Sequence, residues 1–435
     1  MILPETKHRM TRRLNDWDYC QRAIYMITVT LADRTQEWLG TLVEGGEVRC
    51  GNPVPSRSRG VCSAPPRSRG GWRIEPTPYG EAVLEALAEM PRRYPQVQIL
   101  ERQLMPEHFH FIVFVKTQLP KPLGALIRGF KAGAAKRWKS LAENGAARHD
   151  GTRAGAVAPH CAARAGAVAP HCAARAGAVA PHSCGGCPAW ADGFQDTILF
   201  REGQLTAMIE YIRDNPRRLA EKRSNPALFK RVASLALPLD GGRLVGRFEA
   251  LGNRHLLERP LHQVQCSRHF CAYRRIAKTG GGLKIARDAE GEPIVERTSP
   301  EYDERLAAAI AAAAHGAVVI SPCISDGERQ IAREALKRHL PLVTLQNKGF
   351  AKLQKPVGRY FDACAEGRLL MMAPAAWPYT PQEKTMTRFD ATAMNRICQW
   401  LAGENAAEIN YHGMTPANID RLAEEAIMAN AKEGR

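Results

Sequence analysis

Two histidines separated by one residue carry the clearest chemical signal in the sequence. His108 and His110 open an apolar run that continues to Val115. Alternate side chains of a β-strand point to the same face, so both imidazoles would project together from positions about 7 Å apart. Two such imidazoles can bind one divalent metal ion. The alternative is a pair of histidines whose hydrogen bonds are satisfied inside a protein core.

A tyrosine and an asparagine further along the chain are predicted to share one face of a helix. The segment from Glu202 to about Asp214 is predicted to form an amphipathic helix. Tyr211 lies on the flank of its apolar stripe, and Asn215 follows one turn later on the same face. Pro216 is expected to end the helix. Tyr211 could equally be an ordinary tyrosine at the edge of a core.

A third segment, Leu123–Leu141, is predicted to be a helix with one apolar stripe and many basic residues. Beside a metal-binding strand, these basic residues are candidates for contact with phosphates of a nucleic acid. A solvated helix face is the alternative. The basic residues are Arg128, Lys131, Lys136, Arg137 and Lys139.

Short apolar and β-branched segments predict the strands that would position these residues. Ala23–Leu31, Trp38–Val43, Val97–Met105 and His108–Val115 are expected to be strands, and Tyr79–Tyr94 an amphipathic helix. The sequence Met-Pro-Glu before His108 marks the break between two strands, because proline cannot donate a hydrogen bond to a β-ladder.

Composition favours a polyanionic partner. The 435 residues include 61 Lys and Arg against 44 Asp and Glu, a net charge of +17. Residues 1–235 carry 34 basic and 21 acidic side chains, so the excess lies mainly in the first half. The N-terminus has no apolar run as long as a signal peptide core, and no apolar run in the sequence is as long as a membrane span. The 12 cysteines lack disulfide-like spacing, so we expect a cytoplasmic protein. With DNA as the polyanionic partner, we expect it to be nucleoid-associated.

Two stretches have a composition that cannot build a core. Residues 51–71 and 144–189 are therefore predicted to be flexible inserts. The second contains an eleven-residue repeat, RAGAVAPHCAA, and it ends in the single Cys-x-x-Cys pair, Cys184 and Cys187. That pair supplies half of a zinc site at most. We interpret the repeat as a duplicated insert.

The last third of the chain alternates helices with apolar strands, which predicts a parallel sheet in an α/β domain over residues 300–435. Residues 236–299 are expected to be a linker. Ser325, Asp326 and Gly327 follow a predicted strand and begin a helix, where free backbone N–H groups could bind an anion. Helix capping alone also explains these residues.

Three ordered motifs resemble those of HUH single-tyrosine transposases. MPEHFHFIV resembles the family signature, Met-Pro-x-His-x-His followed by apolar residues, and PLGALIRGFKAGAAKRW resembles the helix after it. YIRDNP resembles the Tyr-Ile-x-x-Asn-Pro of the branch associated with repetitive extragenic palindromes (REP), and PTPYGEAVLEAL also fits. The resemblance covers about residues 20–143 and 190–230.

The resemblance implies an α+β ferredoxin-like domain over residues 1–235 that cleaves and rejoins single-stranded DNA beside a hairpin. It further implies that His108, His110 and Asn215 bind Mg²⁺ or Mn²⁺, which polarises the scissile phosphate. Tyr211 would attack that phosphate and form a phosphotyrosyl enzyme, with no nucleotide cofactor. Whether the tyrosine acts within one chain or across a homodimer stays open.

The second domain resembles, more weakly, the Rossmann-like α/β fold of DNA-processing protein A relatives. The matching segments are VVISPCISDGER, LVTLQNKGF and KPVGRYFDACAEGRLLMMAP. Two alternatives to a transposase remain: a non-catalytic or domesticated nucleic-acid-binding protein, and a nucleotide-sensing module led by this domain.

Overall fold

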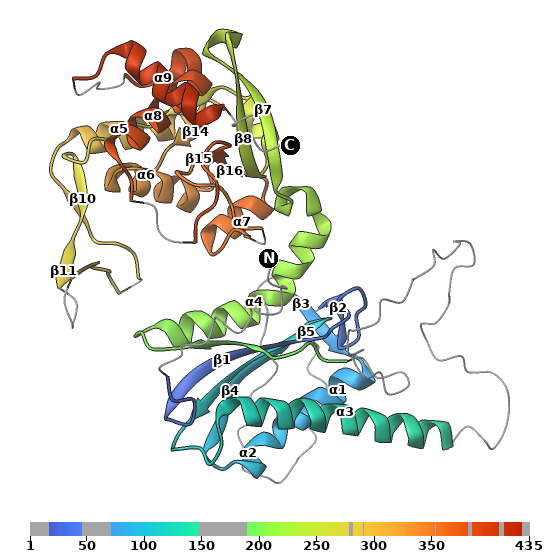
Figure 1. Cartoon of the computed structure of the whole chain (residues 1–435). Coiled ribbons are helices and arrows are strands. Elements are labelled where there is room, and N and C mark those ends of the chain that lie inside the picture. Colours follow the sequence, from blue (N-terminus) through green and yellow to red (C-terminus); the bar gives the residue numbers. More distant parts are fainter. Residues whose placement is uncertain are drawn as a thin grey trace, which may run out of the picture. The chain divides into compact units, whose positions relative to one another are not determined.

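The computed structural model describes residues 17–45, 71–147, 189–277, 282–289, 291–352, 354–381, 385–408 and 413–428 (Figure 1). The chain forms two compact units, Met1–Ala220 and Glu221–Arg435, and each is considered by itself. The repeat, the Cys184–Cys187 pair and most of both predicted inserts lie outside the described residues.

An antiparallel sheet of four strands forms the first unit. Its order is β4-β5-β1-β6, and the strands are β4 (Val97–Leu104), β5 (His108–Val115), β1 (Ala23–Thr30) and β6 (Gln195–Ile198). The predicted strands at 23–31, 97–105 and 108–115 are confirmed to within one residue. A separate hairpin pairs β2 (Gly40–Glu44) with β3 (Trp72–Pro76).

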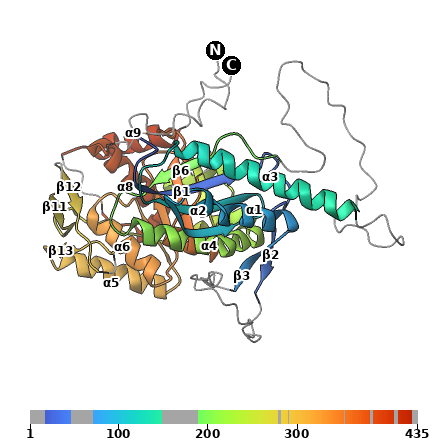
Figure 2. The same ribbon diagram turned by 90° about the horizontal axis from the view of Figure 1, so that it is seen from below.

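The two faces of this sheet carry different side chains. Phe109 and Phe111 belong to a core formed with α1 (Pro78–Ala88), the short α2 (Met90–Arg93) and α3 (Leu123–Ala147). Helices α1 and α3 lie side by side on this face (Figures 1 and 2). Strand alternation turns His108 and His110 to the opposite face, which α4 (Gln204–Ser224) covers (Figure 1).

Helix α4 does not end at Pro216, contrary to the prediction. It runs through the proline to Ser224. Proline removes one backbone hydrogen bond and crowds the preceding turn, at a cost of about 3 kcal/mol. Burial of Ile212 and Ala220 on either side, together with ion pairs from Asp214 to Arg217 and Arg218 across the proline, offsets that loss.

The second unit contains a mixed sheet of six strands in the order β7-β8-β16-β15-β14-β9. The last four are parallel to one another, whereas β7 and β8 are antiparallel to their neighbours. The strands are β7 (Val232–Leu239), β8 (Leu244–Gly252), β9 (Leu261–Gln263), β14 (Val318–Ser321), β15 (Leu342–Leu345) and β16 (Leu369–Pro374).

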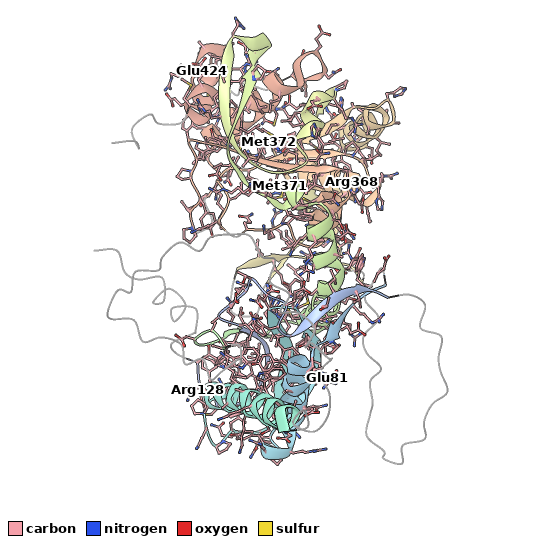
Figure 3. The ribbon with its side chains drawn as sticks, turned by 90° about the vertical axis from the view of Figure 1, so that its right-hand side faces the viewer. Glu81, Arg128, Arg368, Met371, Met372 and Glu424 are labelled. Carbon is pink, nitrogen blue, oxygen red and sulfur yellow. The ribbon has the colours of Figure 1, made fainter. Side chains whose placement is uncertain are left out.

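Helices cover both faces of this sheet. In β16, Met371 and Met372 contribute to different cores because neighbouring side chains point to opposite faces (Figure 3). The face of Met371 is covered by α5 (Glu301–Ala314), α6 (Asp326–Lys337) and α7 (Arg359–Ala365). The face of Met372 is covered by α8 (Arg388–Ala402) and α9 (Pro416–Ile427).

Residues 236–299 are part of the second unit, which corrects the expectation of a linker. They complete β7 and supply β8 and β9, and the buried side chains of Phe248 and Leu261 join its core. They also form two small sheets, β10 (Cys271–Tyr273) with β13 (Val295–Arg297) and β11 (Arg275–Ala277) with β12 (Leu283–Ile285). The 3₁₀ turns are Pro226–Phe229, Asp240–Gly242, Arg254–Glu258 and Gly403–Asn405.

Both units therefore mix helices with sheets, as the sequence suggests for each half. The more specific ferredoxin-like and Rossmann-like assignments remain predictions. Among the described residues, no helix is both long and apolar enough to cross a membrane.

Candidate functional site

The two imidazoles meet at one point on the α4 side of the first sheet. The Nε2 atoms of His108 and His110 are 3.0 Å apart, and the rings are nearly perpendicular. Two nitrogens bound at right angles to one ion, each about 2.1 Å from it, would be separated by about 3.0 Å. The spacing of the pair therefore suits adjacent ligand positions around a single metal ion.

Each imidazole is oriented through its other nitrogen. His108 Nδ1 lies 3.1 Å from Glu107 Oε1, and His110 Nδ1 lies 2.8 Å from the Thr28 hydroxyl. Thr28 stands opposite His110 in the β1–β5 ladder, so the sheet register creates that contact. A ligating histidine commonly donates its second N–H to such a partner, which leaves the Nε2 lone pair for a metal.

Electrostatics keep one of the two imidazoles neutral. Burial, reinforced by the charge of His108, holds the pKa of His110 well below its ordinary value, so this ring is neutral at pH 7. Burial raises the pKa of the Glu107 carboxyl, but its hydrogen bond and charge interaction with His108 and the charge of Arg34 outweigh that effect and lower it overall. With both Nδ1 atoms protonated, the facing Nε2 lone pairs repel unless a positive group, a proton or a cation, lies between them.

Tyr211 lies beside the histidine pair. Its ring centroid is 6.3 Å from that of His110, and its side chain is 39% exposed, so the phenol remains accessible to a large substrate. The guanidinium of Arg218 stands over the tyrosine ring, 5.4 Å from the centroid. Arg218 is buried and bonded to Asp214, so it is held at this position.

Asn215 shares the face of α4 that carries Tyr211, because the helix continues through Pro216. Its side chain is 8% exposed, and its Nδ2 atom has no hydrogen-bond partner among the described residues. An unsatisfied buried amide is costly in a folded protein, which is typical of a group whose partner is a ligand or water.

A buried carboxylate of β4 ties α4 to the sheet. Arg213 Nε lies 2.6 Å from Glu101 Oε2, and Glu101 is 8% exposed. Ile112 of the histidine strand and Ile212 of α4 pack together in the small core beneath. These contacts fix the register of α4 over β5 and thus the position of Tyr211 relative to the imidazoles.

The predicted DNA-binding residues of α3 do not join this site. Helix α3 packs on the other face of the sheet, so the β-layer separates its side chains from the histidines. Lys131 donates to the backbone carbonyls of Ala191 and Gly193, and burial lowers its pKa to about 8, while Arg137 pairs with Glu89. Arg128 (Figure 3), Lys136 and Lys139 are exposed, and a phosphate contact by them remains a prediction.

The capping box predicted in the second unit is present at the start of α6. Ser325 Oγ accepts from the backbone N–H of Glu328, whose carboxylate accepts in return from Ser325 and Ile324. A β-carbon on Gly327 would lie 2.5 Å from the sulfur of Cys266. The chain itself therefore satisfies the N–H group of Glu328 and crowds Gly327, and anion binding at this helix start remains a prediction.

The donor set fits a partial metal site. Among the described residues, no three His, Cys, Asp or Glu side chains converge on one point. The two imidazoles supply two ligands. A third ligand from Asn215 would be its amide oxygen, whereas its unpartnered atom is the Nδ2 donor, so this role remains a prediction. Sequence reasoning missed Thr28, Glu107 and Arg218. The position of Glu107 directly before the first histidine was a usable signal, whereas nothing local marks Thr28 or Arg218.

Comparisons with known proteins add little to this geometry. The sequence matches no family model and no curated protein. Among solved structures, the chain is similar to a REP-associated tyrosine transposase bound to a REP hairpin, with a TM-score of 0.25 and 12% identity. That match covers 48% of this chain and 73% of the other. A likeness at this level does not establish a shared fold or activity.

Proposed function

We propose that this protein cleaves and rejoins single-stranded DNA through a covalent phosphotyrosine, as a metal-dependent transposase. The observation that carries the proposal is the meeting of an accessible phenol and two same-face imidazoles. The Nε2 atoms of His108 and His110 are 3.0 Å apart, and the ring centroids of His110 and Tyr211 are 6.3 Å apart. The net charge of +17 suits a polyanionic substrate.

In this proposal, Tyr211 is the nucleophile. Its phenolic oxygen attacks the scissile phosphorus, the bond from phosphorus to the 3′ oxygen breaks, and the phenol proton ends on the released 3′-hydroxyl. The ester retains the energy of the broken bond, so a 3′-hydroxyl can reverse the step. Arg218, above the tyrosine ring, is placed to stabilise the negative charge of the phosphate.

The remaining residues bind and orient. His108, His110 and Asn215 would hold Mg²⁺ or Mn²⁺, which when bound polarises the scissile phosphate as a Lewis acid. Glu107 and Thr28 fix the imidazoles in the orientation that directs both Nε2 atoms to one point. Because imidazole suits Mn²⁺ better than Mg²⁺, we expect activity to be higher with Mn²⁺.

Formation of a covalent adduct tests the proposal directly. The full chain is incubated with hairpin-bearing single-stranded oligonucleotides and Mn²⁺, and protein–DNA adducts are resolved by denaturing electrophoresis. We expect an adduct with the wild-type chain and none with Tyr211→Phe. A matched control is Tyr379→Phe, which removes the hydroxyl from a tyrosine that is 42% exposed and also has a cation, Lys348, over its ring.

Two results would count against the proposal. An adduct that persists in Tyr211→Phe would place the nucleophile elsewhere. Tight hairpin binding without any adduct, under all metal conditions, would favour a non-catalytic nucleic-acid-binding protein.

A further inference from the structure

A cleft in the second unit has a basic lining that the proposed function does not use. Its volume is about 510 Å³, within the range of about 300–1,000 Å³ that is usual for small-molecule sites. It lies beside α6 and α7, and its lining has three guanidinium groups and one carboxylate, a formal charge of +2. The lining residues are Glu292, Cys323, Arg329, Arg333, Leu336, Arg359 and Tyr360.

The three arginines come from two helices. Two of them face one carboxylate, whereas Arg329 pairs with Asp326 and donates to the Cys323 carbonyl. Arg329 and Arg333 stand four residues apart on α6, and Arg359 is the first residue of α7. Arg359 Nη2 lies 2.5 Å from Glu292 Oε1, and Arg333 Nη1 lies 3.8 Å from Glu292 Oε2. Glu292 therefore presents its two oxygens to two guanidinium groups, as an anionic ligand would.

A tight turn holds Glu292 in that place. The backbone N–H of Glu292 donates to the Asp288 carboxylate, and its carbonyl accepts from the Asp288 N–H. Arg287 donates to the carbonyl of Gly291 in the same turn. The Glu292 side chain is 22% exposed, so the carboxylate lies in the cleft wall and solvent can still reach it.

We propose that this cleft binds a small phosphate monoester of nucleotide size, and that Glu292 occupies the phosphate position until the ligand displaces it. A phosphate matches two guanidinium groups better than one carboxylate does, because it offers three oxygens and more negative charge. Leu336 and the ring of Tyr360 supply an apolar wall for an attached base or sugar. This proposal is independent of strand cleavage in the first unit.

Calorimetric titration of the full chain tests the proposal. The probes are the four 2′-deoxynucleoside 5′-monophosphates, with inorganic phosphate, the unphosphorylated nucleosides and an oligothymidylate without terminal phosphate as comparisons. We expect at least one monophosphate to bind, and its nucleoside not to bind. Arg333→Gln and Arg359→Gln should each weaken binding about tenfold or more, since each removes a charged hydrogen bond.

Glu292→Gln provides the discriminating measurement. It removes the competing charge, so it should bind the same monophosphate several-fold more tightly than the wild-type chain. Arg338→Gln is the matched control, because Arg338 ends the same helix, is half-exposed and pairs with Glu334 outside the cleft. Thermal unfolding of every variant identifies loss of folding, and if one arginine variant unfolds, the other and Glu292→Gln still decide the question.

Three results would overturn the proposal. In the first, neither the wild-type chain nor Glu292→Gln binds a monophosphate. In the second, both arginine variants bind it as tightly as the wild-type chain does. In the third, Glu292→Gln binds it more weakly than the wild-type chain does. Binding of the oligothymidylate alone would assign the cleft to a nucleic acid chain instead of a small ligand.

Discussion

The hydroxyl of Thr28 offers a sharp test of the histidine pair. Thr28→Val keeps the shape of the side chain and removes the oxygen that lies 2.8 Å from His110 Nδ1. His110 is 7% exposed, so its Nδ1 group would be left buried without a partner. An unsatisfied buried donor costs about 1–3 kcal/mol, and we expect the free energy of unfolding to fall by that amount.

The same substitution should weaken metal binding. Without the Thr28 hydroxyl, the proton of the neutral His110 ring can move to Nε2, the atom proposed to bind the metal. Loss of such an orienting partner typically lowers metal affinity about 10–100-fold. Titration of Mn²⁺ into the full chain by calorimetry measures this change, and urea denaturation measures the change in stability.

Thr30→Val is the matched control. Thr30 stands two residues along the same strand, opposite His108, whose Nδ1 is instead bonded to Glu107. We expect Mn²⁺ affinity to stay within about twofold of wild type in this variant, because both imidazoles keep their partners. Equal Mn²⁺ affinity in Thr28→Val and the wild-type chain would refute the proposed role of Thr28. Equal loss in both threonine variants would show that a general change in the strand is responsible.

Three further predictions concern packing and buried charge. Gly327→Ala should lower the free energy of unfolding by about 1–3 kcal/mol, because the new methyl group meets the Cys266 sulfur at 2.5 Å; calorimetric unfolding checks this. Burial raises the pKa of Glu328 to about 7. Between pH 4.5 and 7, the Glu328 carboxyl is therefore protonated in the folded chain and ionised in the unfolded chain. The wild-type chain should therefore lose up to about 3 kcal/mol of stability relative to Glu328→Gln as the pH rises from 4.5 through 7, measured by urea denaturation; a parallel pH dependence in both proteins would contradict this. Glu101→Gln should lower stability by about 1 kcal/mol, since Arg213 is half-exposed, and should reduce adduct formation by loosening α4; an unchanged adduct yield would show that other contacts hold the helix.

Alternation and apolar runs were enough to predict the strands around the site. The side chains of His108 and His110 share a face because strand geometry leaves no other arrangement. The apolar stripe placed Tyr211 only at the edge of a core, and its proximity to the histidines was implied by the family resemblance alone. The end of its helix at Pro216 was predicted wrongly. Local sequence shows that a proline costs stability, but not that packing on both sides will offset the cost.

Tertiary pairing explains what the sequence did not reveal. Lys131 and Arg137 look like neighbouring basic residues of one helix, yet each is committed to a partner distant in sequence, the 191–193 backbone or Glu89. Strand β8 was missed because its pairing with β16 joins residues more than one hundred positions apart. The face of the sheet that a helix covers likewise depends on the order and direction of the strands, which the sequence of a single segment does not determine.

The strand order of the second unit has a consequence for how the chain is made. From β9 through β14 and β15 to β16, each parallel strand is added on the same side of the last, and right-handed crossovers then place α5, α6 and α7 all on one face. The other face, with Val343 and Met372, stays uncovered until α8 and α9 have been synthesised. During translation, this apolar face of the sheet is therefore exposed until the last two helices have been made. Ribosome-bound chains halted before Arg388 should bind chaperones more strongly than chains that include α8 and α9.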